Sequence, residues 1–380
     1  MLTPEQEALR QSVAEFAHEV VAPVIAEHYE HHTFPYDVIR QMGKMGLFGL
    51  PFPEQYGGMG GDYFTLGLAI EELARVDSSV AITLEAAVSL GAMPIYRFGT
   101  EQQKETWLPR LVTGEALAAF GLTEPGFGSD AGGAQTRAVL DEATDEWVIN
   151  GSKAFITNCG TDITAVIAVA AVTGEVNGNK ELSTILVPSG TPGLTVLPGY
   201  SKVGWCASDT HELAFDDVRV PAANLLGERG RGFAQFLRTL DEGRIAIAAL
   251  ATGLAQGCVD ESIRYAGQRQ AFGAPIGSYQ AIQFKIADME ARAHTSRLAW
   301  YHAAERLLAG QGIKREAAIA KLHASESAVA NAREATQIHG GYGFMNEYPV
   351  ARFWRDSKIL EIGEGTSEVQ RMIIARDLGL

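Results

Sequence analysis

The hydrophobic pattern of the 380-residue chain changes its period twice. From residue 3 to about 118, apolar residues recur at helical spacing, as in Val13, Phe16, Val20 and Val24. From about 119 to 226 the chain becomes short β-rich stretches divided by Gly, Pro, Asn and Asp: EWVINGSKAFIT, ITAVIAVAAV, STILVPS and THELAFDDVRVP. From 227 onward long helical patterns return. This order predicts an N-terminal helical domain over 1–118, a middle β-domain over 119–226 and a C-terminal helical domain over 227–380.

The fold class expected from this order is α+β. No helical pattern lies between the β-rich stretches, so a sandwich or barrel fits the middle domain better than a doubly wound α/β sheet. The C-terminal helices are rich in Ala and apolar on more than one side, which is typical of a four-helix bundle that continues into other subunits. We therefore expect an oligomer.

Composition excludes several classes of partner. The net charge of −15 and the lack of basic runs argue against nucleic acid as the main partner. The first residues, MLTPEQEALRQSVAEF, are charged and amphipathic, so we expect neither secretion nor membrane insertion, and a cytoplasmic protein. Cys159, Cys206 and Cys258 form no CxxC pair, and the His residues show no metal spacing, so reduced thiols and no metal site are expected.

A carboxylate between two glycines stands out in the C-terminal stretch EIGEGTSE. Glu361, Glu364 and Glu368 recur at the spacing of a solvated helix face, which is the simplest interpretation. However, Gly363 and Gly365 would each cost about 1 kcal/mol inside a helix relative to alanine. Glu364 is therefore predicted to lie in a short loop that can aim its carboxylate.

A second helix is predicted directly after this loop. Ser367 and Gln370 have the spacing of a capping box, and Val369, Met372 and Ile373 would face inward.

Four glycine-rich or aromatic segments could hold a cofactor. GLTEPGFGSDAGG combines glycines with the hydroxyls of Thr123 and Ser129, which suits a flavin edge or a pyrophosphate, although a plain connection between strands has the same composition. In GSKAFITNCG, Phe155 and Thr157 offer a ring and a hydroxyl on one strand face, unless Phe155 is an ordinary buried core residue. RQAFGAP and QIHGGYGF are weaker signals, and His339 is expected to be packed rather than catalytic.

Together these segments resemble the acyl-CoA dehydrogenase family, closest to its short-chain and short/branched-chain members. The matching motifs are LTEPGFGSDAGG, INGSKAFITN, LDEGRIAIAA, RQAFGAPIGSYQAIQFKIADM, QIHGGYGFMNEYPVARFWRD and EGTSEVQRMIIA, in that order over essentially the whole chain. The resemblance implies a helical, a β and a four-helix domain, a homotetramer, FAD as cofactor and an acyl-CoA thioester as substrate.

The resemblance also assigns residues to the FAD site. In the same subunit Leu122 and Thr123 would meet the flavin ring, Ser129 the pyrophosphate, and Phe155 and Thr157 the ring face and its N5 region. A neighbouring subunit would hold the adenosine diphosphate portion, with Thr366 and Glu368 near the adenine; the neighbour's residues would be Arg269, Phe272, Gln280, Gln337 and Gly341.

Glu364 matches the glutamate that serves as catalytic base in most of the family. The resemblance implies that it removes the α-proton of the thioester while the β-hydride moves to flavin N5, giving a trans-2-enoyl-CoA. Some relatives instead carry the base at the position that Gly243 occupies here. Because glycine has no carboxylate, that alternative is closed for this chain, and the neighbouring Glu242 is a lesser candidate. Asp241 and Arg244 match substrate-binding positions, unless they form only a surface ion pair.

One departure from the family pattern bears on the substrate. Gly363 replaces the bulky aromatic that precedes the base in most relatives, which suggests room for an α-branched or otherwise wide short acyl group. Phe155 stands where many members have Trp, and it keeps a stacking ring.

Two other functions compete with this interpretation. One is an oxygen-using flavoprotein of the same fold, such as an acyl-CoA oxidase or a monooxygenase relative, and the other is a non-catalytic acyl-CoA or flavin binder. Fatty-acid β-oxidation, branched-chain amino-acid degradation and sterol-fragment oxidation all use the dehydrogenase chemistry. By resemblance, the expected electron acceptor is electron-transferring flavoprotein.

Overall fold

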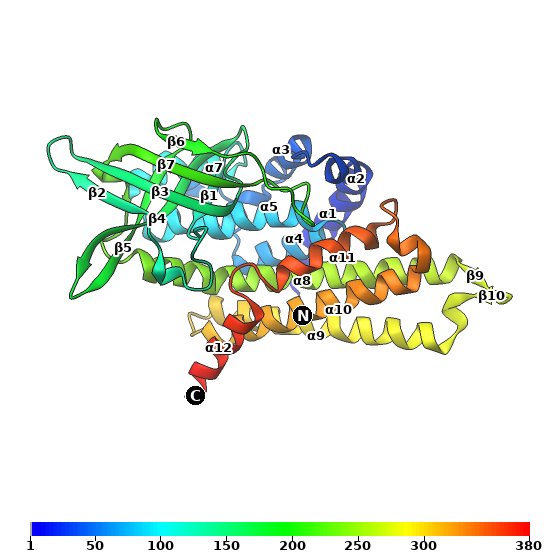
Figure 1. The fold of residues 1–380 in the computed structure, drawn as a ribbon. Coiled ribbons are helices and arrows are strands. Elements are labelled where there is room, and N and C mark those ends of the chain that lie inside the picture. Colours follow the sequence, from blue (N-terminus) through cyan, green and yellow to red (C-terminus); the bar gives the residue numbers. More distant parts are fainter. Residues whose placement is uncertain (1) are drawn as a thin grey trace.

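The computed structural model describes residues 2–380, and it confirms the helix, strand, helix order. Figure 1 shows the sheet at one end of the molecule, the N-terminal helices beside it, and the long C-terminal helices running beneath both. The N-terminal helices are α1 (Pro4–Phe16), α2 (Ala22–His31), α3 (Tyr36–Lys44), α4 (Tyr63–Ala74), α5 (Ser78–Glu85), α6 (Met93–Phe98) and α7 (Glu101–Val112).

Two π-helical turns interrupt this domain, η1 (Ala17–Val21) and η4 (Ala86–Ala92). The first one corrects the predicted core face of the first helix. A π turn contains an extra residue, so it rotates the positions that follow it around the helix axis. As a result Val21 and Ile25 are buried, whereas Val20 is only half-buried and Val24 is 40% exposed.

The middle domain is built on a mixed eight-stranded sheet in the order β6-β7-β3-β2-β4-β5-β8, with β1 paired in parallel to β4. Two of the predicted stretches coincide with strands β3 and β7, and the other two lie almost wholly within β4 and β5. Strands β1, β2, β6 and β8 were not predicted from the sequence. The strands are β1 (Leu117–Gly121), β2 (Arg137–Asp141), β3 (Glu146–Thr157), β4 (Thr164–Val176), β5 (Asn179–Pro188), β6 (Leu194–Val196), β7 (Thr210–Pro221) and β8 (Leu225–Leu226).

The C-terminal domain packs α8 (Gly232–Gln268), α9 (Gln280–Leu308), α10 (Lys314–His339) and α11 (Pro349–Leu360) into a bundle, followed by α12 (Ser367–Asp377). The strand pair β9 (Gln270–Ala271) and β10 (Ala274–Pro275) forms a small hairpin between α8 and α9. This hairpin lies at the end of the bundle farthest from the sheet (Figure 1).

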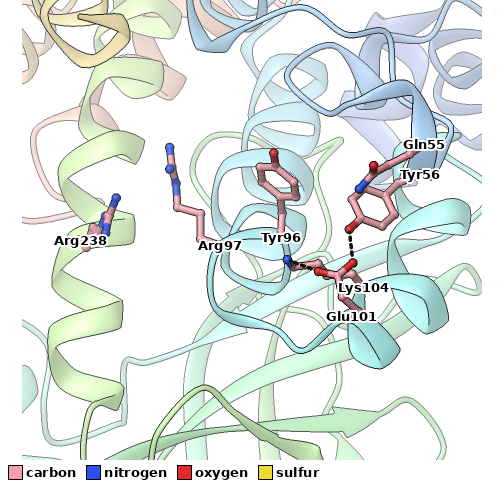
Figure 2. Close-up of a pocket in the computed structure, with 7 residues that line it drawn as sticks. All are labelled: Gln55, Tyr56, Tyr96, Arg97, Glu101, Lys104 and Arg238. Atoms are coloured by element: carbon pink, nitrogen blue, oxygen red, sulfur yellow. Dashed lines mark hydrogen bonds and ion pairs between the residues drawn. The ribbon is translucent and has the colours of Figure 1, made fainter. Parts of the chain in front are cut away.

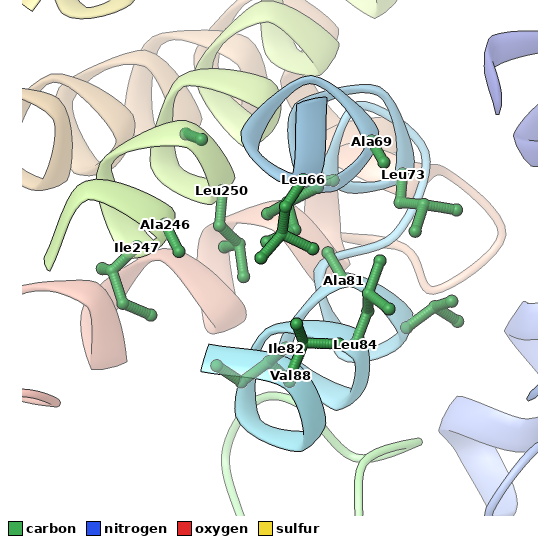
Figure 3. Close-up of a cluster of buried hydrophobic side chains, with 14 of the residues drawn as sticks. Leu66, Ala69, Leu73, Ala81, Ile82, Leu84, Val88, Ala246, Ile247 and Leu250 are labelled. Atoms are coloured by element: carbon green, nitrogen blue, oxygen red, sulfur yellow. The ribbon is translucent and has the colours of Figure 1, made fainter. Parts of the chain in front are cut away.

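The first half of α8 joins the bundle to the N-terminal domain. Figure 3 shows side chains of α4, α5, η4 and α8 converging in one apolar cluster, which includes Leu66, Leu84, Val88, Ile247 and Leu250. Burying such side chains stabilises the contact by about 1.5–3 kcal/mol each. This contact fixes the position of α8 relative to α5 and η4. All three of these elements border the candidate site.

A buried carboxylate joins all three domains. Asp356 of α11 accepts hydrogen bonds from the Tyr29 hydroxyl of α2, the Ser78 hydroxyl of α5 and the backbone N–H of Trp205, each at 2.7 Å. Burial raises the pKa of Asp356, and these three donors oppose that shift. The network fixes α11, and therefore the loop that follows it, against the other domains.

One segment, Ser78–Phe98, is long and apolar enough to cross a membrane by length and composition, but 94% of its most apolar window is buried inside the protein. It includes α5, η4 and α6, whose apolar side chains form part of the core.

Candidate active site

Glu364 lies in the loop between α11 and α12, as the two glycines predicted. Its backbone adopts the left-handed conformation, with φ of 53°, and Gly365 follows with φ of 94°. At Gly365 a Cβ would lie 2.8 Å from the side-chain nitrogen Nε2 of Gln370. Both the left-handed backbone and the lack of space therefore favour glycine at this position. The loop therefore turns sharply at Glu364 and points its side chain inward.

The start of α12 corrects the predicted capping box. Thr366, not Ser367, is the N-cap, and its hydroxyl accepts a hydrogen bond from the Val369 N–H at 3.3 Å. Gln370 turns back to the loop instead of capping the helix. Of the residues expected to face inward, Val369 and Ile373 are half-buried and Met372 is 51% exposed.

Two buried side chains hold the carbonyl groups of this loop. Lys321 of α10 is fully buried and its Nζ donates to the Gly365 carbonyl at 2.8 Å. The Gln370 side-chain amide donates to the Gly365 carbonyl at 2.8 Å and to the Glu364 carbonyl at 3.3 Å. Sequence reasoning missed the role of Lys321, since a lysine within a helical pattern is usually solvated, and nothing near it in the sequence marks its partner.

The carboxyl group of Glu364 lies in a low-dielectric environment near the positive charges of Lys321 and Arg244. Burial raises the pKa of Glu364 to about 7, against the opposing effects of a hydrogen bond with the Glu85 side chain and of the Lys321 and Arg244 charges. The Oε2 atom makes no hydrogen bond to any residue in the described range 2–380. A carboxylate with this pKa and a free oxygen can take up a proton near neutral pH.

The position of Gly243 on α8 makes room for this carboxyl group. A Cβ at residue 243 would lie 2.5 Å from Glu364 Oε2 and 3.2 Å from Leu90. At Gly363, by contrast, a Cβ would contact only the Ile359 carbonyl oxygen, at 3.4 Å, so the space beside this residue is open.

Arg244 is buried, so it is not the surface residue that the alternative interpretation required. It pairs with Asp241, three residues earlier on α8, and only 4% of its side chain is exposed. Its Nε has no hydrogen-bond partner within residues 2–380. Burial raises the pKa of Asp241, which the Arg244 charge opposes.

Glu242 is buried and paired with an arginine. Its Oε2 accepts from Arg97 at 2.8 and 3.0 Å. Arg97 and Arg238 stand on one side of a surface cleft of about 340 Å³ (Figure 2), whose other lining residues are Gln55, Tyr56, Tyr96, Glu101 and Lys104. Arg97 therefore holds the carboxylate of Glu242 in an ion pair.

The glycine-rich loop after β1 is anchored by a buried ion pair that sequence reasoning did not find. Lys153 Nζ contacts Glu124 Oε1 at 2.8 Å, and the same carboxylate accepts from the N–H groups of Gln135 and Thr136 at 2.7 and 2.9 Å. A Cβ at Gly126 or Gly128 would meet nothing within 4 Å. Ser129 is exposed, while Leu122 is buried and Thr123 is half-buried next to β3.

Phe155 is not an ordinary buried strand residue. It sits where the β3–β7 register shifts, with φ of 59°, and its side chain is 64% exposed and stacked on Tyr200 at 5.1 Å between ring centroids. A bulge of this kind turns a side chain out of the sheet. The exposed ring and the neighbouring half-buried Thr157 fit a planar ring such as a flavin, and the open glycine loop suits its phosphates.

The remaining predicted FAD residues lie elsewhere. Phe272 follows β9 and is 98% exposed, in the hairpin that Figure 1 places far from the sheet. Exposed residues on neighbouring helix ends are Arg269, Gln280, Gln337 and Gly341. One chain therefore does not bring the two predicted halves of the FAD site together. Thr366 and Glu368 stand at the start of α12, close in sequence to Glu364.

His339 is packed, as expected. Its ring stacks on Tyr265 at 4.2 Å, and Nδ1 lies 2.8 Å from the Ala335 carbonyl oxygen. Over residues 2–380, no group of three His, Cys, Asp or Glu side chains could hold a metal ion, and the three cysteines are buried free thiols.

The chain matches three family models in succession. These are the acyl-CoA dehydrogenase N-terminal domain over residues 3–115, its middle domain over 119–218 and its C-terminal domain over 230–379. It is 51% identical over 379 residues to the probable acyl-CoA dehydrogenase YngJ of Bacillus subtilis (strain 168), covering 99% of this chain and 98% of that one.

Solved structures give the same result. Butyryl-CoA dehydrogenase from Megasphaera elsdenii superimposes with a TM-score of 0.96 at 43% identity, covering 100% of this chain and 99% of that one. A chain from work on the electron transferring flavoprotein of Acidaminococcus fermentans has a TM-score of 0.96 at 42% identity and covers 100% and 98%.

Proposed function

Because the chain belongs to the acyl-CoA dehydrogenase family, whose members are FAD-binding oxidoreductases, we propose that it oxidises a short or short/branched-chain acyl-CoA to the trans-2-enoyl-CoA with Glu364 as base. The observation that carries this proposal is the buried Glu364 carboxyl group, fitted against Gly243 and with its pKa raised to about 7. The similarity to butyryl-CoA dehydrogenase favours a short chain.

Glu364 acts on the α-proton in this proposal. Its free Oε2 takes the proton from the α-carbon, and its raised pKa makes it a stronger base than a solvated glutamate. The left-handed backbone at Glu364 and the hydrogen bonds from Lys321 and Gln370 keep the carboxyl group in place during the transfer.

The same loop supplies a donor for the thioester. The backbone N–H of Glu364 donates to no group within residues 2–380, so it is free to hydrogen-bond the thioester carbonyl oxygen. Such a bond strengthens as negative charge develops on that oxygen, which lowers the barrier to enolate formation. Arg244 and Asp241 then help to position the coenzyme A thioester.

The residues present fit FAD. The flavin and pyrophosphate would be held by Leu122, Thr123, Ser129, Phe155 and Thr157. A neighbouring subunit would supply the second set, Arg269, Phe272, Gln280, Gln337 and Gly341. The adenine would lie near Thr366 and Glu368. When bound, FAD supplies the two-electron acceptor for the hydride that leaves the β-carbon.

A homotetramer is part of this proposal. The described chain exposes large apolar side chains around the far end of the bundle, including Phe272, Phe284, Phe344 and Met345 at 98%, 62%, 80% and 45%. Soluble monomers rarely expose many large apolar groups in one region, so contact with other subunits accounts for them. Electron-transferring flavoprotein is the proposed electron acceptor.

An anaerobic titration with acyl-CoA thioesters tests the proposed function. The purified yellow protein would be mixed with butyryl-, isobutyryl-, 2-methylbutyryl-, isovaleryl-, hexanoyl- and octanoyl-CoA while the flavin absorbance is followed. We expect bleaching by one short or branched thioester. A yellow protein that none of them bleaches would contradict the proposed reaction, and rapid reoxidation by air after bleaching would favour an oxidase.

A further inference from the structure

The loop that joins β6 to β7, residues 197–209, begins and ends beside the residues proposed to face the flavin. We call it the bridging loop. Near its start, the Tyr200 ring stacks on Phe155 at 5.1 Å between ring centroids, and the Tyr200 N–H donates to the Thr210 carbonyl at 3.2 Å. At its end, Thr210 is the register partner of Thr157 in the β3–β7 pair. The bridging loop is therefore tied at both ends to the part of β3 that carries Phe155 and Thr157.

The middle of the bridging loop docks on α11, the helix that leads into the loop of the proposed base. The backbone N–H of Trp205 donates to the Asp356 carboxylate at 2.7 Å. The indole N–H of Trp205 donates to Ser78 Oγ at 3.1 Å, and the Ser78 hydroxyl itself donates to Asp356 at 2.7 Å. A Cβ at Gly204 would lie 2.7 Å from the Arg355 carbonyl oxygen. Backbone therefore packs directly on backbone at this contact, with no room for a side chain between them.

Trp205 holds an unusual backbone conformation at this contact. Its φ is 51°, in the left-handed region that bulky side chains rarely adopt. Within residues 2–380, the other Phe, Tyr or Trp residues with positive φ are Phe155 and Phe272, which are both predicted FAD residues. A conformation of this kind persists only where the surrounding contacts hold it, and it is often found at functional sites. In Trp205 it is held by the hydrogen bonds to Asp356 and Ser78.

Hydrogen bonds inside the bridging loop make it a stiff connection. The Lys202 ammonium group donates to the Ser208 carbonyl and to the Thr210 hydroxyl, at 2.5 and 2.9 Å. The Cys206 thiol lies 3.4 Å from the Lys202 carbonyl oxygen, and Cys206, Ala207 and Ser208 are buried. A shift of the docked middle of the loop would therefore be passed on to its two ends.

The proposed reaction requires the flavin and the base to be held at a fixed spacing on either side of the acyl chain, because reacting groups must be aligned closely. The flavin would be held by the middle domain, whereas Glu364 follows α11 of the bundle. We propose that the bridging loop sets this spacing, with Trp205 as its positioning residue. Trp205 acts through α11 and is not a catalytic residue. This inference rests on the proposed function, since it concerns the alignment of that same reaction.

Gly204→Ala tests the contact between the bridging loop and α11. Its methyl group would lie 2.7 Å from a backbone oxygen, which cannot swing away as a side chain can, so the loop must move off the helix. We expect the limiting rate of flavin reduction, at a saturating concentration of the acyl-CoA that reduces the wild type, to fall by roughly 10-fold or more while FAD content is kept. The Kd for that acyl-CoA should change less than the rate. Gly267→Ala is the matched control, because a Cβ there meets nothing within 4 Å.

Two substitutions of Trp205 test its backbone conformation. Both Trp205→Asn and Trp205→Val remove the indole, but asparagine tolerates the left-handed conformation and valine does not. Trp205→Asn should therefore keep most of the limiting rate, and Trp205→Val should lose roughly 10-fold or more. Asp145→Val is the control for backbone strain alone: Asp145 has φ of 55° and lies at the opposite end of β3 from Thr157, so this variant should lose stability and keep the rate.

Hydrogen–deuterium exchange gives a measurement that does not depend on catalysis. It would be followed for the peptide spanning residues 200–209 in the purified enzyme without substrate. We expect faster exchange in Gly204→Ala and Trp205→Val than in Trp205→Asn and the wild type, because only the first two detach the loop from Asp356.

The outcomes separate this inference from the proposed function. A wild-type rate in Gly204→Ala, or equal rates in the two Trp205 variants, overturns the positioning role while the dehydrogenase activity of the wild type stands. A rate that falls only in proportion to FAD content also overturns it, since the loop would then serve stability alone. Absence of bleaching of the wild type by every thioester overturns the proposed function instead.

Discussion

The carboxyl group of Glu364 occupies the space that a side chain at Gly243 would need. A Cβ at residue 243 would lie 2.5 Å from Glu364 Oε2, closer than unbonded atoms approach. Gly243 is on α8 and Glu364 is in the loop after α11, so the two positions meet only in the folded bundle. A carboxylate can therefore reach this point from the loop or from α8, but not from both.

Gly243→Ala should displace Glu364 and slow the reaction. A misplacement of about 1 Å costs on the order of 100-fold in rate when a reacting group must be aligned. The measurement is the rate of flavin reduction in stopped flow with a saturating short acyl-CoA. Gly267→Ala is the matched control, because Gly267 is on the same helix and a Cβ there meets nothing within 4 Å. Equal rates for both variants would contradict the fit of Glu364 against Gly243.

Glu364→Gln should remove the base and keep the fold. We expect flavin reduction to slow by about 10²–10⁴-fold, the range that general base catalysis contributes, with FAD content unchanged. Glu361→Gln in the same loop should keep the wild-type rate, because the Glu361 side chain pairs only with the exposed Lys358. A wild-type rate of flavin reduction in Glu364→Gln would show that another group removes the α-proton.

The pH dependence should report the ionisation of Glu364. The base acts when ionised, and with a pKa of about 7 the value of kcat/KM should rise as pH increases through about 7 and level off above it. Lys321→Met removes a positive charge that lowers this pKa, so the rise should move to higher pH. A rise at the same pH in both proteins would show that another group controls the rate.

The same ionisation affects stability in a defined direction. The folded-state pKa of Glu364, about 7, exceeds its ordinary value of 4.5, so its contribution to stability is fully present below pH 4.5 and is lost as pH rises through 7. Thermal melting should therefore show Glu364→Gln gaining more over the wild type at pH 8 than at pH 5.

Lys153→Met should destabilise the protein and loosen FAD. It would leave the Glu124 carboxylate, which is 5% exposed, without its buried counter-ion, and breaking a buried pair in this way costs about 3–5 kcal/mol. Chemical denaturation gives the free energy of unfolding, and the absorbance ratio gives FAD content. The Glu124→Gln, Lys153→Met double variant should recover much of the loss. No recovery would mean that the lysine acts through something other than this pair.

Gly363→Tyr should narrow the substrate range. A side chain at residue 363 has an open path, since its Cβ would contact only the Ile359 carbonyl oxygen at 3.4 Å, and the backbone there is not left-handed. We expect kcat/KM to fall selectively for isobutyryl- and 2-methylbutyryl-CoA while butyryl-CoA keeps most of its rate. An equal loss on straight and branched chains would exclude Gly363 as the source of extra width.

Features that depend on neighbouring residues were predictable. The change from helical to strand spacing marked the three parts of the chain, and the two glycines around Glu364 marked a loop, because periodicity and glycine preferences act over a few residues. The ordered motifs identified the family. The π turn η1 escaped prediction, since a single extra residue in a turn leaves no separate mark in the apolar spacing, and it moved the buried face from Val20 and Val24 to Val21 and Ile25.

The environment of Glu364 was decided by tertiary structure alone. The sequence by itself determined which carboxylate stands in a glycine-bounded loop, because that signal lies within a few residues. Only the fold brought Glu85, Gly243 and Lys321 to it, from three helices separated by dozens of residues. Burial and charge at a point depend on every element packed around it, so the raised pKa of Glu364 exists only in the assembled bundle.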